Sequence, residues 1–157
     1  MRVAAHGLTV ATPDGWETRI ERPEAIEEGA VALPRIHAAT FPLPEERGDF
    51  GSGAVDLMAG GDVFVSLLEY EAREAESALF GKRGLPRTLD PERFKTNQLQ
   101  RWIPGQAGLQ EFLVEKGRPF CLYVVIGSFL NRVTLAQLAG ELLATIIVES
   151  PTPPGIR

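Results

Sequence analysis

Side chains that act as general bases, nucleophiles or metal ligands are scarce in this chain. Its 157 residues include two histidines and one cysteine, which are His6, His37 and Cys121. His37 is the better candidate for a base, because the extended segment 35–41 would hold its ring and a carboxylate of a neighbouring strand could orient it. No nucleophile stands at motif spacing from His37, and a structural or surface histidine is therefore the simpler interpretation.

Cys121 offers little chemistry of its own. It lies within the apolar run 120–126, where burial raises a thiol pKa and makes cysteine behave as a small hydrophobic residue. A single cysteine can form neither an intramolecular disulfide nor a zinc site that needs several thiolates. The sequence therefore predicts no metal site and no catalytic cysteine.

Two glycine-containing segments are incomplete versions of nucleotide-binding motifs. Gly51-Ser52-Gly53 lacks the third glycine of the dinucleotide fingerprint, and no convincing strand leads into it. Gly81-Lys82 is followed by Arg83, at a position where a phosphate-binding loop needs serine or threonine to bind magnesium. We therefore predict no cofactor and assign no catalytic residue. An enzyme would need a site assembled from residues scattered along the chain.

Charge is distributed unevenly along the chain, whose formal net charge is −5. Between Gly81 and Arg101, basic residues outnumber Asp90 and Glu92, and Trp102 follows directly. Tryptophan beside arginine is typical of binding hot spots, where apolar area and bidentate donors act together. The predicted interface consists of Lys82, Arg83, Arg87, Arg93, Arg101 and Trp102. The alternative is that these charges are solvated loops without a target, and that Trp102 closes one end of the core.

The overall composition narrows the class of partner. A mildly acidic chain is not attracted to nucleic acid as a whole, so we expect no nucleic-acid partner. The longest unbroken apolar run, 120–126, is far shorter than the roughly 20 residues of a membrane span. The first residues lack the apolar core of a signal peptide. These features predict a cytoplasmic protein, and the excess of arginine over lysine indicates a bacterial genome rich in GC pairs.

Extended segments bounded by turn residues predict six or more strands. Pro13-Asp14-Gly15 predicts a turn that joins two strands within 7–20 as a hairpin. A second hairpin is expected within 108–126, with its turn at 116–118. The nearly continuous apolar character of 62–70 predicts a strand in the centre of the sheet. Further strands are predicted at 35–41, 99–103 and 145–148.

Helical patterns are fewer than strand patterns. Thr134 and Gln137 fit a capping box at a helix start, and the following helix would present one apolar stripe, made of Leu135, Leu138, Ala139 and Leu142. Ser52 is expected to cap a short helix over 52–59. Residues 21–33 are predicted to be irregular, and 71–96 to run over the surface outside the core.

This pattern predicts an α+β fold in which a mainly antiparallel β-sheet is flanked by a few helices in a single-domain sandwich. Regular alternation of strands and helices is lacking, which argues against a doubly wound nucleotide-binding fold. The length fits one globular domain, assigned to residues 1–150. Residues 151–157 are expected to form a proline-rich C-terminal tail.

The order of these elements resembles a known family. An opening Gly-Leu-Thr-Val-Ala-Thr-Pro-Asp-Gly-Trp-Glu segment, a long central hairpin and a closing Leu-Ala-Gln-Leu-Ala-Gly-Glu-Leu-Leu-Ala-Thr-Ile-Ile-Val segment look like the α/β/α sandwich domains of the Mog1/PsbP type. The likeness covers most of the chain, and its local signature is the Pro-x-Gly-Trp turn. It implies a binding or assembly module and assigns no functional residues.

Two functions follow as hypotheses. The first is a non-enzymatic protein-binding or assembly module of a bacterial cytoplasmic complex, whose charged loops contact a protein partner or form a homo-oligomer. The second is a small-molecule-binding protein with a pocket between sheet and helices, lined by His37 and Tyr123. Apolar pockets need few polar groups and therefore leave little trace in a sequence.

Overall fold

The computed structural model describes residues 1–24 and 32–151. The predicted irregular segment 21–33 and the tail 151–157 thus lie mostly outside the described residues. Within the described ranges, eight strands form two antiparallel sheets. The strands are β1 (Arg2–Ala5), β2 (Leu8–Ala11), β3 (Glu17–Glu21), β4 (Arg35–Ala39), β5 (Val63–Glu69), β6 (Ala107–Glu115), β7 (Arg118–Ile126) and β8 (Ile146–Val148).

Helical structure is limited within the described ranges. The one α-helix is α1 (Arg132–Leu143). Five 3₁₀ helices accompany it: η1 (Val55–Leu57), η2 (Ala72–Glu76), η3 (Ala78–Phe80), η4 (Pro91–Arg93) and η5 (Phe129–Asn131). The chain is mostly β with little helix, which agrees with an α+β class at a coarse level.

The larger sheet has the strand order β3-β4-β5-β7-β6. The predicted central strand is confirmed, because β5 lies in the middle and all but the last of its residues are buried. The predicted second hairpin is also confirmed: β6 and β7 pair from Ala107 opposite Ile126 to Glu115 opposite Arg118. Lys116 and Gly117 both have positive φ, as the two-residue turn of such a hairpin requires.

The predicted opening hairpin is wrong, although both of its strands exist. The turn forms, with the amide of Trp16 donating to the carbonyl of Pro13. The strands on its two sides then join different sheets. β2 pairs with β1 and β8 in the three-stranded sheet, whereas β3 pairs with β4. Local turn chemistry therefore fixes a change of direction, and tertiary packing decides which strand is the partner.

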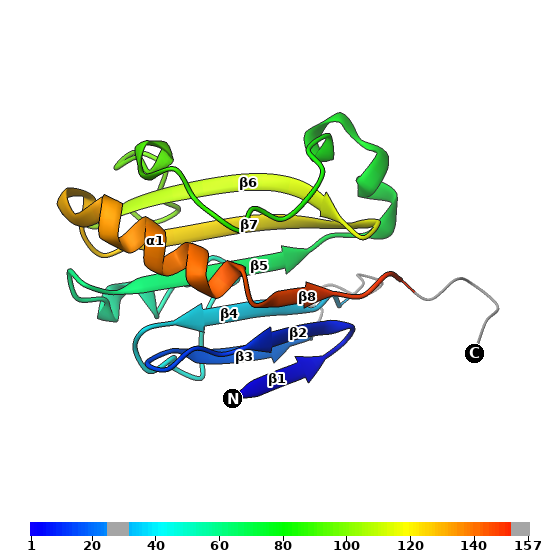
Figure 1. Cartoon of the computed structure of the whole chain (residues 1–157), viewed down its shortest axis with the longest axis horizontal. Helices are drawn as coiled ribbons and strands as arrows, with labels where there is room; N and C mark the ends of the chain where they lie inside the picture. Colours follow the sequence, from blue (N-terminus) through cyan, green and yellow to red (C-terminus); the bar gives the residue numbers. More distant parts are fainter. Residues whose placement is uncertain (25–31, 152–157) are drawn as a thin grey trace.

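One face of the five-stranded sheet is covered by regular elements. Figure 1 shows α1 and the three-stranded sheet lying in front of it. The main core fills this interface, where Leu8 and Ile146 of the smaller sheet share a cluster with Val65, Leu122 and Leu142. The predicted stripe on α1 is confirmed, because Leu135, Ala139 and Leu142 are buried and Leu138 packs against them.

The predicted capping box is wrong. The helix begins at Arg132, so Thr134 lies inside its first turn and Asn131 occupies the N-cap without a side-chain hydrogen bond. The hydrogen bond from the amide of Phe129 to the carbonyl of Gly105 ties the preceding 3₁₀ turn to the loop before β6. The short helix expected over 52–59 is reduced to η1, which Ser52 does not cap.

The other face of the five-stranded sheet is covered by irregular chain from 41–58 and 97–103. A second cluster lies there, in which Leu43, Phe64, Tyr123 and Val125 are buried. Gly51 is required at this site: its φ is +84°, and a Cβ atom would lie 2.5 Å from the Phe64 ring.

Two further predictions are corrected by this packing. The segment 99–103 is not a strand; Leu99 and Ile103 pack on the second cluster from a loop. The segment 71–96 is not wholly superficial, because Phe80, Leu85, Leu89 and Phe94 are buried in it. These apolar residues are separated by charges and prolines, so neither a period of 2 nor one of 3.6 reveals them.

Candidate functional site

The basic segment 81–101 touches the outer edge of β6 at two points and crosses the α1 face between them. Its two ends pair with β6 through the backbone, at Val114 beside Arg83 and at Gly108 beside Lys95. Between these points, Lys82 and Arg93 both form ion pairs with Glu111 of β6, whose side chain is largely buried. Part of the predicted positive charge is therefore used to neutralise a buried carboxylate.

Arg87 has a structural contact as well. Its guanidinium donates to the carbonyl of Leu143 at 2.7 Å and to that of Ile146 at 2.6 Å, and it lies 3.7 Å from the carboxylate of Glu115. These carbonyls belong to the end of α1 and the start of β8, where a cation complements the helix dipole. Arg87 thus joins the basic segment to the front layer.

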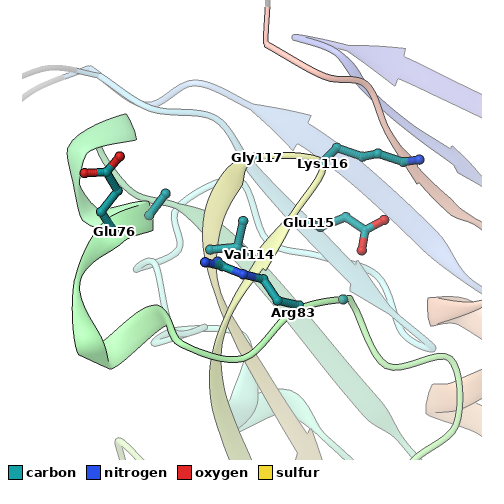
Figure 2. A pocket seen from close by; sticks show the side chains of 8 residues that line it. Glu76, Arg83, Val114, Glu115, Lys116 and Gly117 are labelled. Carbon is teal, nitrogen blue, oxygen red and sulfur yellow. The ribbon is translucent and has the colours of Figure 1, made fainter.

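Arg83 is the predicted interface cation that has no acidic partner among the described residues. It lies in a cavity of about 500 Å³ between η2, the segment 83–84 and the β6–β7 turn. Figure 2 shows its guanidinium group beside Val114, with the Lys116 side chain directed away from it. Glu115 faces the α1 side, where its carboxylate accepts from the amide of Leu85 at 2.9 Å.

Trp102 lies at the opposite end of β6 and does not close the core: 69% of it is exposed. Neighbouring Arg101 forms a 2.7 Å ion pair with Asp56 of η1. Gln106 donates to the carbonyl of Val55 at 2.9 Å, which fixes this loop against η1. Trp102 is therefore held on an ordered loop with its side chain in solvent.

Further exposed apolar side chains belong to the same end of the molecule. Leu57 of η1 is 60% exposed and Leu130 of η5 is 88% exposed. Val133, in the first turn of α1, is exposed as well. The bond from Phe129 to Gly105 brings η5 to the loop that carries Trp102. We call the set Leu57, Trp102, Leu130 and Val133 the Trp102 end.

The predicted interface residues do not form one continuous surface. Arg83 and Trp102 lie near opposite ends of β6, and Gly108 and Val114 alone are separated by about 20 Å along a strand. Leu57, Leu130 and Val133 were missed by sequence reasoning. These three residues stand in or next to segments with an ordinary apolar or helical pattern. Such a pattern does not show which of its apolar side chains face solvent.

The two predicted pocket residues lie in one row across the loop-covered face. His37 is opposite Ser66 on β5, and Ser66 is opposite Tyr123 on β7. Their face of the sheet is the one away from α1. Both residues are buried. The hydroxyl of Tyr123 accepts from the amide of Gln100 at 2.8 Å, and its ring packs edge-on against Phe50.

His37 anchors the loop above it. Its Nδ1 accepts from Nε of Arg47 at 3.0 Å, so Nε2 carries the proton and donates to the carbonyl of Asp49 at 3.0 Å. Ser66 donates to the same carbonyl at 2.7 Å. Burial, aided by the charges of Arg35 and Arg47, lowers the pKa of His37 to about 3. Both ring nitrogens of this neutral imidazole are hydrogen-bonded within the protein, so His37 has a structural role.

A second cavity lies beside α1, between the helix and the segment 87–91. It measures about 420 Å³, and its lining includes Leu89, Pro91, Val133 and Ala136. Gly140 permits this close approach, because a Cβ atom there would lie 3.2 Å from the carbonyl oxygen of Arg87. The lining is mainly apolar with a few polar groups at its rim, as in small-molecule sites.

Metal and thiol chemistry find no support in residues 1–24 and 32–151. These ranges contain no group of three or more histidine, cysteine, aspartate or glutamate side chains that could hold a metal ion. Cys121 is buried, and burial raises the pKa of its thiol. No helix in the described part of the chain is long and apolar enough to cross a membrane.

Comparison of the chain with protein-family models, with curated proteins and with solved structures gives no match. The likeness to Mog1/PsbP domains therefore stays a prediction. Any function must be argued from the surfaces and cavities of this chain.

Proposed function

We propose that this chain is a non-enzymatic protein-binding or assembly module of a bacterial cytoplasmic complex, and that it associates through the Trp102 end. The observation that supports this most directly is the exposure of Leu57, Trp102 and Leu130, which lie on η1, the loop before β6 and η5, three segments tied together by hydrogen bonds. Large apolar side chains grouped in this way are typical of protein contact sites.

The occupant proposed for this surface is a second copy of the chain. Two ion pairs flank the apolar side chains of the Trp102 end: Arg101 with Asp56, and Arg132 with Glu92. A two-fold interface brings the same patch of each copy together, and therefore needs a surface that complements itself. An apolar centre with equal numbers of cations and anions around it meets that need.

The test is the oligomeric state of the purified protein, measured by sedimentation velocity over a wide range of concentration. Trp102→Ala should weaken self-association by about 30-fold, as expected for a central aromatic residue. Leu79→Asp is the matched control, because Leu79 is also exposed but belongs to η3 near the other end of β6. A monomer at every concentration, or equal effects of both variants, would overturn the assignment.

The cavity beside α1 supports a second candidate, a small-molecule-binding protein. It lies on the sheet face that carries α1, so it is distinct from the buried row of His37 and Tyr123. The fluorescent apolar anion 1-anilinonaphthalene-8-sulfonate should bind there and raise the melting temperature. Ala144→Glu at the cavity should cancel the effect, and Ala72→Glu in η2 should preserve it. No shift with the unaltered protein would remove this candidate.

A further inference from the structure

The outer edge of β6 is only partly paired. Val114 donates to the carbonyl of Lys82 at 2.9 Å and accepts from the amide of Gly84 at 2.8 Å. At the other end, Gly108 exchanges two backbone hydrogen bonds with Lys95, of 2.9 and 3.0 Å. The outer edge of β6 therefore already forms backbone hydrogen bonds with other segments at two points. Its geometry is suitable for pairing with a further strand.

Two residues between these points present the same backbone groups outward. Along a strand, the N–H and C=O groups of every second residue point to the same side. Gln110 and Phe112 lie at even spacing from Gly108 and Val114, and their backbone groups thus point away from β7. Among the described residues, no backbone hydrogen bond to this outward side of Gln110 or Phe112 is present.

The chain that covers both ends of this edge leaves its middle open. Figure 1 shows the segment after η3 passing in front of β6 and β7 before it returns at η4. Leu85 and Leu89 draw this segment into the core on the α1 side. On the opposite side of the edge, a groove of about 460 Å³ is lined by Gln98, Leu99, Gln110 and Phe112 with their neighbours.

We propose that this open stretch binds an extended peptide, which adds to the larger sheet as a short strand beside β6. The outward backbone groups of Gln110 and Phe112 would form four hydrogen bonds with an antiparallel segment, as in other cases of strand addition. The proposal uses a different surface from the Trp102 end and does not rest on self-association.

The side chains beside the β6 edge indicate which residue types the bound peptide should have. Its residue opposite Glu111 would face the α1 side, where two cations, Lys82 and Arg93, share one carboxylate. An acidic side chain suits this local excess of positive charge. The residues opposite Gln110 and Phe112 would face the groove, where Leu99 and the half-buried Phe112 ring lie among amide side chains. The preferred segment is therefore β-branched, acidic, β-branched.

The probe is a capped synthetic peptide, Thr-Val-Asp-Val-Thr, added to the isotopically labelled full chain. Binding should shift the amide resonances of Gln110 and Phe112 and slow their hydrogen exchange by at least about tenfold at saturation. Gln110→Pro removes the outward donor without breaking a bond to β7, because proline is tolerated on edge strands. It should weaken binding by at least about fivefold relative to Gln110→Ala.

A chemical control removes any dependence on the folding of the proline variant. The same peptide with its two valines N-methylated lacks the donors that a strand must provide, and it should not bind the unaltered protein. Equal binding of both peptides, or no change at the Gln110 and Phe112 amides, would overturn strand addition. Trp102→Ala should leave peptide binding unchanged, which separates this result from the test of self-association.

Discussion

The two faces of the five-stranded sheet are covered in different ways. On the α1 face, a helix and a second sheet pack through aliphatic side chains such as Leu135 and Leu142. On the other face, irregular chain is held down by a buried polar network in which His37, Arg47 and Glu21 participate. The first face depends mainly on apolar area, whereas the second combines the apolar cluster around Phe64 and Tyr123 with matched hydrogen bonds.

This difference teaches where single substitutions should have the most severe consequences. Apolar packing is spread over many contacts, so each side chain contributes a part of the total. A buried network fails as a unit, because removing one partner leaves the others desolvated without compensation. The loop-covered face should therefore be more sensitive to the loss of one polar side chain than the α1 face is to the loss of one aliphatic side chain.

The largest effect is expected for Arg47→Ala. The Arg47 side chain is fully buried and forms an ion pair with Glu21, while its Nε donates to His37. Its removal should lower the free energy of unfolding by about 4 kcal/mol, because the buried imidazole of His37 loses its donor, Glu21 keeps only the 3.5 Å contact with Arg35, and a cavity remains. Urea unfolding measures this loss. Arg73→Ala, at a side chain that is 79% exposed, is the control and should change stability by less than about 0.5 kcal/mol.

Leu142→Ala probes the α1 face. Leu142 is fully buried between the helix and the sheet, and truncation of such a leucine costs about 3 kcal/mol through lost transfer energy and a residual cavity. The same urea unfolding experiment gives the value. A loss clearly larger than that of Arg47→Ala would reverse the comparison and would place the dominant stabilisation on the apolar face.

The pH dependence of stability isolates His37. Its pKa is about 3 in the folded chain, and unfolded histidine titrates near 6.5. Between these values the unfolded chain binds a proton that the folded chain does not. Stability from this residue is thus complete above about pH 6.5 and falls by about 1.4 kcal/mol for each pH unit below it.

Between about pH 7 and about pH 5, the free energy of unfolding should therefore decrease by about 2 kcal/mol more in the unaltered protein than in His37→Gln. A measurement at about pH 6 should give an intermediate value. The variant keeps a donor for the carbonyl of Asp49 but carries no titrating ring. Carboxylates contribute equally to both chains and cancel in the difference. Parallel pH profiles for the two proteins would contradict the structural role assigned to His37.

The same contrast explains what could be predicted from the sequence. The strands β5, β6 and β7 and the stripe on α1 follow from apolar patterns, because a regular element repeats its environment at a fixed period. The segment 99–103 has an alternating pattern as well, but its residues form loop structure over the second cluster. Leu99 and Ile103 are partly buried, as the alternation predicted, but Arg101 between them is exposed and the backbone is not a strand.

The candidate surfaces were harder to predict, because they depend on pairing between distant residues. The sequence identified the basic segment, but it could not show that Glu111 would neutralise Lys82 and Arg93. Likewise, the sequence left Trp102 as either a binding residue or a core residue. In the structure it lies on a loop with its side chain exposed. The open part of the β6 edge has no sequence signal, since backbone groups are the same at every residue.

The smallest effect is expected for Arg87→Ala, which is the polar counterpart of Arg47 on the α1 face. Arg87 donates to two carbonyls near the end of α1, but 40% of its side chain is exposed. Water can replace these bonds, so the free energy of unfolding should fall by only about 1 kcal/mol. A loss equal to that of Arg47→Ala would show that burial does not set the cost.

This contact also affects tests of the predicted basic interface, because Arg87 already has structural partners. A charge reversal that tests the predicted basic interface, as distinct from the Trp102 end, therefore belongs at Arg83, since Arg87→Glu would combine a binding effect with a loss of stability.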